Sequence, residues 1–93
     1  MRIRWRPLAE ADRDAIIDYI AQDNPLAAIE LGDTINERVA ELSAYPKLHR
    51  LGRVKGTREM VVHPNYLVVY RIRRDSIKIV RVLHSARQWP PAH

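Results

Sequence analysis

The chain has 93 residues, a formal net charge of +5 and no cysteine. A chain of this length has room for one small core, and without cysteine it has neither a disulfide framework nor a thiolate ligand for zinc. Charges interrupt every apolar run well short of the ~20 apolar residues that a bilayer requires. We therefore expect a single domain over residues 1–93, no membrane association and a reducing compartment, the cytoplasm.

The positive charge lies almost entirely in the second half of the chain. Residues 1–46 carry five Lys or Arg and nine Asp or Glu, a net charge of −4, whereas residues 47–93 carry eleven and two, a net charge of +9. This asymmetry favours a polyanionic partner for the second half, either nucleic acid or an acidic protein segment. A basic surface that serves only solubility is the alternative.

The first half begins with a predicted strand and a predicted helix. Arg2–Trp5 alternates polar and apolar residues, which predicts a short strand at or near a sheet edge, ended by Pro7. A helix is predicted from Leu8 because apolar residues recur at helical spacing, with the acidic residues mostly facing away. The apolar stripe consists of Leu8, Ala11, Ala15, Ile16, Tyr19 and Ile20, and the acidic residues are Glu10, Asp12, Asp14 and Asp18.

A second helix is predicted to follow at once. Asn24 is a suitable N-cap, and Pro25 suits the first helical position because its missing N–H is not needed there. Pro46 disfavours helical geometry in the preceding residue, so the helix should end near Tyr45. The short connection predicts a helical hairpin. The apolar stripe of the second helix is Ala28, Leu31, Ile35, Val39 and Leu42.

The second half predicts a basic loop followed by three antiparallel strands. Residues 46–58 contain one proline, two glycines and five cations, which indicates a loop, and the β-branched and aromatic runs at 59–62, 66–72 and 76–84 indicate strands. Both faces of these strands are largely apolar, and two helices cover only one face. We therefore expect a partner or a ligand on the second face.

The alternation of side chains assigns the strand residues to faces. In the middle strand Tyr66, Val68, Tyr70 and Ile72 point one way, and Leu67, Val69 and Arg71 point the other way. In the last strand Ile77, Ile79, Arg81 and Leu83 oppose Lys78, Val80, Val82 and His84.

Four histidines raise the question of a metal site. None is paired at helical spacing with another, and none has a carboxylate nearby in the sequence. The segment Gly52–Gly56 has two glycines but precedes a strand, so it offers no helix N-terminus to a phosphate. We predict no metal site and no cofactor. The four histidines are His49, His63, His84 and His93.

Metal-independent cleavage of RNA is the enzymatic chemistry that the second half best suits. It requires a base, cations that stabilise the charged phosphorane, an acid and an aromatic surface on which a nucleobase stacks. In the structural alternative, the ring of His84 bonds a backbone carbonyl at a strand end and Trp89 covers the core. The candidates are His84 or Glu59 as the base, Arg58, Arg71, Arg81 or Arg87 as the clamp, and Trp89 or Tyr66 as the stacking surface.

The order of these motifs resembles the RelE/ParE superfamily of toxins from type II toxin-antitoxin modules. The resemblance covers essentially the whole chain, and its most specific parts are Arg58-Glu59, the Tyr-x-Val-x-Tyr-Arg strand at residues 66–71, and Arg-Val-Leu-His-Ser-Ala-Arg at residues 81–87. It implies an α+β fold with a short N-terminal strand, a helical hairpin and a three-stranded antiparallel meander in a sheet of about four strands. The helices would lie on one face, and a cognate antitoxin would wrap the open face.

The superfamily divides by mechanism, and the resemblance implies two alternatives. RelE-like members are metal-independent ribonucleases that cleave messenger RNA on the ribosome, whereas ParE-like members act on DNA gyrase. RelE-like enzymes have an arginine directly after the tyrosine that opens the middle strand, where this chain has Leu67. Against the YafQ-like nuclease pattern His84 fits and His49 falls near a matching position, but Asn65 replaces an aspartate and Val61 a histidine. These departures favour growth arrest by inhibition of gyrase over messenger RNA cleavage, with operator DNA binding alongside the antitoxin as a third expectation.

Three overlapping sets of residues are expected at functional surfaces, beside the helical hairpin as a contact surface for the target. The catalytic residues of a nuclease would be His84, Arg87, Arg81, Arg58 and Glu59. The residues that contact the target or nucleic acid would be Arg53, Lys55, Arg58, Arg71, Tyr66 and Trp89. The antitoxin would contact Leu67, Val69, Arg71 and Arg81.

Overall fold

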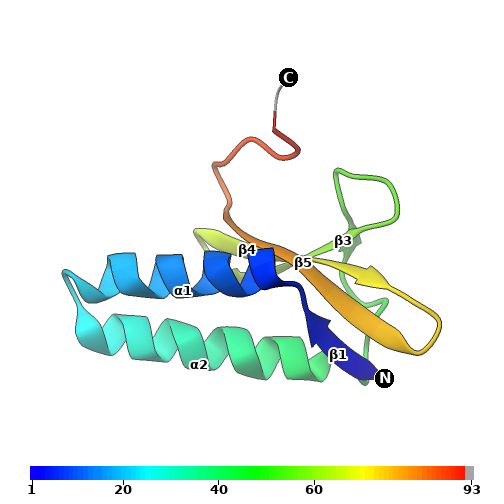
Figure 1. The fold of residues 1–93 in the computed structure, drawn as a ribbon, viewed down its shortest axis with the longest axis horizontal. Coiled ribbons are helices and arrows are strands. Elements are labelled where there is room, and N and C mark those ends of the chain that lie inside the picture. Colours follow the sequence, from blue (N-terminus) through cyan, green and yellow to red (C-terminus); the bar gives the residue numbers. More distant parts are fainter. Residues whose placement is uncertain (92–93) are drawn as a thin grey trace.

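A helical hairpin packs on one face of a five-stranded sheet in the computed structural model, which describes residues 1–91 (Figure 1). The sheet order is β1-β5-β4-β3-β2, with β1 parallel to β5 and the other neighbours antiparallel. The predicted α+β class, hairpin and meander are confirmed. The elements are β1 (Arg2–Trp5), α1 (Pro7–Ala21), α2 (Pro25–Glu41), β2 (Arg50–Leu51), β3 (Arg58–His63), β4 (Tyr66–Ile72) and β5 (Ser76–His84).

Helix α2 follows the sequence prediction closely. The side chain of Asn24 caps it by accepting a hydrogen bond of 3.0 Å from the N–H of Ala27. All five residues of its predicted stripe are buried. The helix ends at Glu41, earlier than the predicted end near Tyr45. The chain tightens into turns after Glu41, where the N–H of Ala44 donates a 3.1 Å hydrogen bond to the carbonyl of Glu41.

The predicted orientation of α1 is confirmed only in part. Leu8 and Tyr19, two residues of the predicted stripe, are 53% and 69% exposed. Ile16 and Ile20 pack against the core as predicted, together with the fully buried Ala9. Asp12, which was expected to face away, shares the inward side with these residues. Its carboxylate bonds Arg81 of β5, so a paired charge occupies a position that periodicity assigns to an apolar residue.

The expected basic loop contains the short strand β2, which brings the sheet to five strands instead of about four. Arg50 pairs with Glu59 and Leu51 with Arg58. The turn between β2 and β3 is closed by a 2.8 Å hydrogen bond from the N–H of Gly52 to the carbonyl of Thr57. Gly56 lies in this turn with φ 83°, a conformation that favours glycine.

A register shift opposite Val69 and Tyr70 changes the faces along β5. Ile77 and Ile79 join the core under the helices, and Val80 lies in a second cluster on the opposite face, as the alternation predicted. Val82, however, returns to the helical side, and Leu83 joins the second cluster. The predicted face assignment is therefore wrong for Val82 and Leu83, because the irregularity interrupts the simple alternation of side chains.

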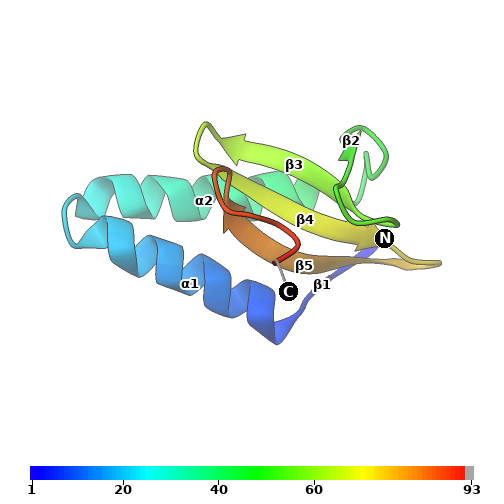
Figure 2. The ribbon, with the colours of Figure 1, turned by 90° about the horizontal axis from the view of Figure 1, so that it is seen from above.

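The second face of the sheet is covered by the chain itself. Figure 2 shows the C-terminal segment after β5 lying over the side of the sheet that faces away from the helices. Trp89 from this segment packs on a cluster of four side chains. These side chains are covered within the chain, where each is at most 6% exposed, so they do not need the expected partner or ligand to cover them. The cluster consists of Leu67, Val69, Val80 and Leu83.

Over residues 1–91, none of the helices has the length and apolar character needed to cross a bilayer.

Candidate functional site

A surface cleft lies between α1 and the ends of β4 and β5. Its larger part has a volume of about 570 Å³. The residues that line it include Tyr19 of α1, Tyr66 of β4, His84 of β5 and Asn65, which lies in the turn before β4. A neighbouring hollow shares His84 and adds Arg87. We call this continuous surface the α1–β5 cleft. It brings together three residues that the sequence analysis selected: Tyr66, His84 and Arg87.

The imidazole of His84 lines this cleft, and one of its two ring nitrogens is bonded to the backbone. The Nδ1 atom accepts a hydrogen bond of 3.0 Å from the N–H of Ala86, so the neutral ring carries its proton on Nε2. The expected bond from the ring to a backbone carbonyl is replaced by this bond, in which the ring accepts. The ring meets Tyr66 edge-on, with centroids 5.3 Å apart at 80°. The pair fixes the imidazole orientation and leaves Nε2 for an external group.

Arg87 is placed by a turn directly after β5. Its N–H bonds the carbonyl of His84 at 2.9 Å, and its own carbonyl accepts a 3.4 Å hydrogen bond from Arg53. The guanidinium group forms no ion pair within residues 1–91, and the residue is exposed. It is therefore the cation of the cleft that is available to an anion.

Glu59 lies outside the cleft and is engaged by arginines. Its side chain is 2% exposed, with Oε1 3.2 Å from Arg50 Nη2 and 3.5 Å from Arg53 Nε. Oε2 accepts a further bond of 2.9 Å from the N–H of Arg53. These contacts make Glu59 a structural anchor for the β2 segment. A carboxylate held in this way has no access to a substrate and does not suit the expected role of a base.

Arg81 is likewise held inside the protein. Its Nε and Nη2 atoms lie 2.6 Å and 2.9 Å from the two carboxylate oxygens of Asp12, and both side chains are 11% exposed. The hydrogen bond to Asp12 raises the pKa of Arg81 above its ordinary value. Arg81 also lies 5.6 Å from the ring centroid of Trp89. A residue bound in this way is not a free phosphate clamp.

Two other predicted cations, Arg58 and Arg71, lie toward the other end of the sheet. Arg58 pairs with Tyr70, whereas His84 pairs with Tyr66, about 13 Å farther along β4. Arg58 donates to the carbonyl of His49 at 2.8 Å, and Arg71 donates to the carbonyl of Lys55 at 3.2 Å. Of the proposed clamps, the structure therefore places Arg87 beside His84 in the cleft, whereas Arg58 and Arg71 lie farther along the sheet and Arg81 is bound by Asp12.

His49 packs beside Tyr70, away from His84. Burial, helped by the nearby charge of Arg38, lowers the pKa of His49, and burial raises the pKa of Tyr70. The hydroxyl of Tyr70 donates a 2.6 Å hydrogen bond to the carbonyl of Pro46. In residues 1–91 no group of three or more His, Asp or Glu side chains is arranged to hold a metal ion, and His93 lies outside the described residues.

Sequence reasoning missed Asp12 and Tyr19 as residues of the cleft. Tyr19 was assigned to the core because its spacing matches an apolar helical stripe. A signal for Asp12 was present in β5, since Arg81 interrupts an apolar run and a cation there requires an anionic partner from another element.

Comparison with known proteins gives a consistent relationship. Residues 3–89 match the model of the ParE toxin family, described as the ParE toxin of a type II toxin-antitoxin system. The chain is 42% identical over 90 residues to a protein provisionally named toxin Y4kP from Sinorhizobium fredii, covering 96% of this chain and 93% of that protein. It is 40% identical over 83 residues to toxin RelE2 from Caulobacter vibrioides, covering 89% and 91% of the two chains.

A solved structure agrees with these relatives. The chromosomal ParDE toxin-antitoxin system from P. aeruginosa superposes with a TM-score of 0.81 at 27% identity, over 90% of this chain and 95% of that chain. Fold and relatives together define a toxin of a type II toxin-antitoxin system. The chain belongs to the ParE toxin family, within the RelE/ParE superfamily.

Proposed function

We propose that this toxin arrests growth by ParE-like inhibition of DNA gyrase. The observation that supports the proposal is that charged groups that a nuclease would need are already paired with other side chains of the toxin. Glu59 is bound by Arg50 and Arg53, and Arg81 is bound by Asp12. Leu67 occupies the position where RelE-like enzymes have an arginine, and it is 2% exposed beneath the C-terminal segment. A protein that acts by binding has no need of these groups as free acids, bases or clamps.

The outer face of the helical hairpin is the surface that we assign to the target. Four large apolar side chains on α1 and α2 are between 53% and 69% exposed, more than a small protein without partners requires. The basic half offers a second contact, suited to DNA held by the enzyme. The four apolar side chains are Leu8, Tyr19, Leu26 and Ile29.

An assay of gyrase supercoiling with purified toxin tests the proposal. We expect inhibition that increases with toxin concentration and that weakens when Leu26 and Ile29 are both replaced by Ser. A matched double replacement of Leu48 and Leu51 by Ser, two exposed apolar residues outside the hairpin, should leave inhibition nearly unchanged. Full supercoiling activity at toxin concentrations well above that of gyrase would refute the proposal.

Ribosome-dependent cleavage of messenger RNA is the second candidate, and the α1–β5 cleft is the observation that favours it. His84 offers Nε2, Arg87 offers a free cation and Tyr66 offers an aromatic ring, which are the groups that acid-base cleavage of RNA uses. Translation of a reporter message followed by primer extension tests this function. Cuts in phase with codons, abolished by His84→Ala or Arg87→Ala, would establish the nuclease.

A cognate antitoxin is the partner that we propose for this toxin in the cytoplasm, as in the ParDE system that it resembles. We further propose that the antitoxin brings the toxin to operator DNA, as a secondary activity. Binding of DNA by the isolated toxin should then be weak. Tight, strongly salt-dependent binding by the isolated chain would instead indicate a DNA-binding function of its own.

A further inference from the structure

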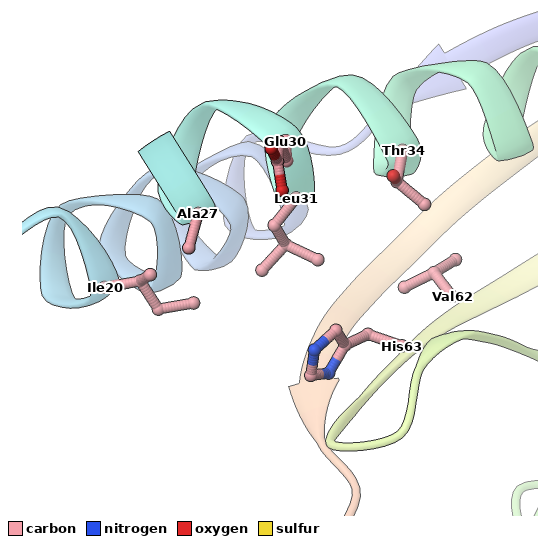
Figure 3. Close-up of a pocket in the computed structure, with 7 residues that line it drawn as sticks. All are labelled: Ile20, Ala27, Glu30, Leu31, Thr34, Val62 and His63. Carbon is pink, nitrogen blue, oxygen red and sulfur yellow. The ribbon is translucent and has the colours of Figure 1, made fainter. Parts of the chain in front are cut away.

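A groove separates helix α2 from the outer edge of strand β3. Figure 3 shows side chains of α2 on one side of the groove, with Val62 and His63 of β3 on the other. The groove has a volume of about 280 Å³, and Ala27, Leu31 and Val62 make its lining largely apolar. It is separate from the α1–β5 cleft, with which it shares no lining residue.

The edge of β3 beside this groove is unpaired. Strand β2 pairs only with Arg58 and Glu59, so Met60–His63 have β4 on one side and no strand on the other within residues 1–91. Such an edge presents N–H and C=O groups to a further strand. Proteins usually block a free edge with Lys, Pro or a covering segment, and Met60–His63 contain neither residue. Val61 on this edge is 48% exposed.

The charge along the groove selects its occupant. Glu30 of α2 lines the groove, and Glu37 follows on the same side of the helix by helical spacing, whereas Glu41 is paired with Arg38 at 3.7 Å. No Lys or Arg lies among Met60–His63 to neutralise this wall. A second copy of the chain, paired edge to edge, would bring two acidic walls together. An extended segment that carries Lys or Arg beside its apolar side chains is complementary instead.

We propose that the edge Met60–His63 receives an extended segment of the cognate antitoxin as a sixth strand of the sheet. Apolar side chains of that segment enter the groove against Leu31 and Val62, and a basic side chain meets Glu30. The added strand covers four residues of β3, a length of about 13 Å. This inference rests on the proposed antitoxin partner, and it does not depend on which target the toxin inhibits.

Hydrogen exchange of the purified toxin, alone and with the antitoxin encoded in the adjacent reading frame, tests the added strand. Alternate amides of Met60–His63 point away from β4, and we expect their exchange to slow by about tenfold or more in the complex. The affinity of the antitoxin should fall by about fivefold or more in Glu30→Arg. The matched control Asp33→Arg makes the same change of charge on the same helix, away from the groove, and should change affinity by less than about twofold.

Three results would overturn the inference. The first is a complex in which Met60–His63 exchange as fast as in the free toxin, and the second is equal weakening by Glu30→Arg and Asp33→Arg. The third is absence of any binding by the adjacent product. Gyrase inhibition is measured on toxin without antitoxin. A toxin that does not inhibit gyrase is therefore distinguished from a toxin that does not receive the added strand.

Discussion

Asp12 and Arg81 lie 69 positions apart in the sequence and join α1 to β5 by two hydrogen bonds of 2.6 Å and 2.9 Å. The pair lies just beyond the end of β1, whose last residue pairs with Ile79. There the carboxylate of Asp12 also accepts a 3.1 Å hydrogen bond from the N–H of Val82. One side chain thus fixes the rotation of α1 and satisfies a backbone group at the sheet edge.

Removal of Asp12 should therefore destabilise the fold strongly. In Asp12→Ala the Arg81 cation stays largely buried without its partner, a change that costs about 3 kcal/mol or more. Urea unfolding measures the loss. The control Asp14→Ala, which removes an exposed carboxylate on the same helix, should cost no more than about 0.5 kcal/mol. Similar losses in both variants would show that the Asp12–Arg81 pair has no special role.

The same pair explains why the predicted orientation of α1 was correct for Ile16 and Ile20 but wrong for Asp12. Periodicity identified the helix and its approximate start, but it assumed that acidic residues face solvent. Asp12 faces inward because Arg81 meets it there, so the buried side follows Ala9, Ile16 and Ile20. In α2 no charge interrupts the stripe, and its five buried residues were predicted correctly.

Glu59→Gln separates a structural role from a catalytic role for Glu59. The substitution keeps the shape but removes the charge that holds Arg50 and Arg53, and we expect a loss of stability of about 2 kcal/mol. Thermal unfolding measures this loss. Growth arrest at a temperature where the variant is folded should persist. A fully stable variant that no longer arrests growth would point to Glu59 as a catalytic group.

Trp89→Ala should uncover the second face of the sheet. Leu67, Val69 and Leu83 lose the ring that packs on them, and we expect a destabilisation of about 2 kcal/mol together with binding of a hydrophobic dye. Gln88→Ala, which changes an exposed neighbour, is the control. Unchanged stability and no dye binding in Trp89→Ala would mean that the C-terminal segment contributes little to covering this face.

We expect the free energy of unfolding to decrease under mildly acidic conditions because of His49. Burial first, and then the charge of Arg38, lowers its pKa below the ordinary value of 6.5, while Glu41 opposes them in part. The unfolded chain then binds a proton that the folded chain resists, so stability is lost as pH falls below 6.5 toward the lowered pKa. Thermal midpoints at about pH 7.5 and about pH 5.5 should differ more for the wild type than for His49→Gln. An equal drop in both proteins would contradict this role.

The strands of the sheet could be predicted from the sequence only in part. Three strands followed from β-branched and aromatic runs, and Arg2–Trp5 was correctly expected at an edge. Strand β2 has two residues, too few to produce a pattern, and the register shift in β5 leaves no mark in its composition. The apolar second face was read correctly as apolar, but its cover is Trp89 of the same chain, a long-range contact that local patterns do not reveal.

The cleft was predicted in part. Tyr66, His84 and Arg87 were selected because their chemistry stands out in the sequence, and the structure brings them together. Glu59 and Arg81 were selected on the same grounds, but their partners lie on other strands and helices. Only the tertiary structure distinguishes a free charged group from one that is already paired.

A gyrase reaction on relaxed plasmid, with purified toxin and then with toxin plus antitoxin, tests whether the toxin acts on gyrase. The supercoiled product and the cleaved DNA that remains attached to gyrase are measured together. Inhibition of gyrase predicts loss of supercoiling, accumulation of cleaved DNA and reversal of both by the antitoxin. Unchanged supercoiling at every toxin concentration, in a preparation that cleaves messenger RNA on ribosomes, would contradict it.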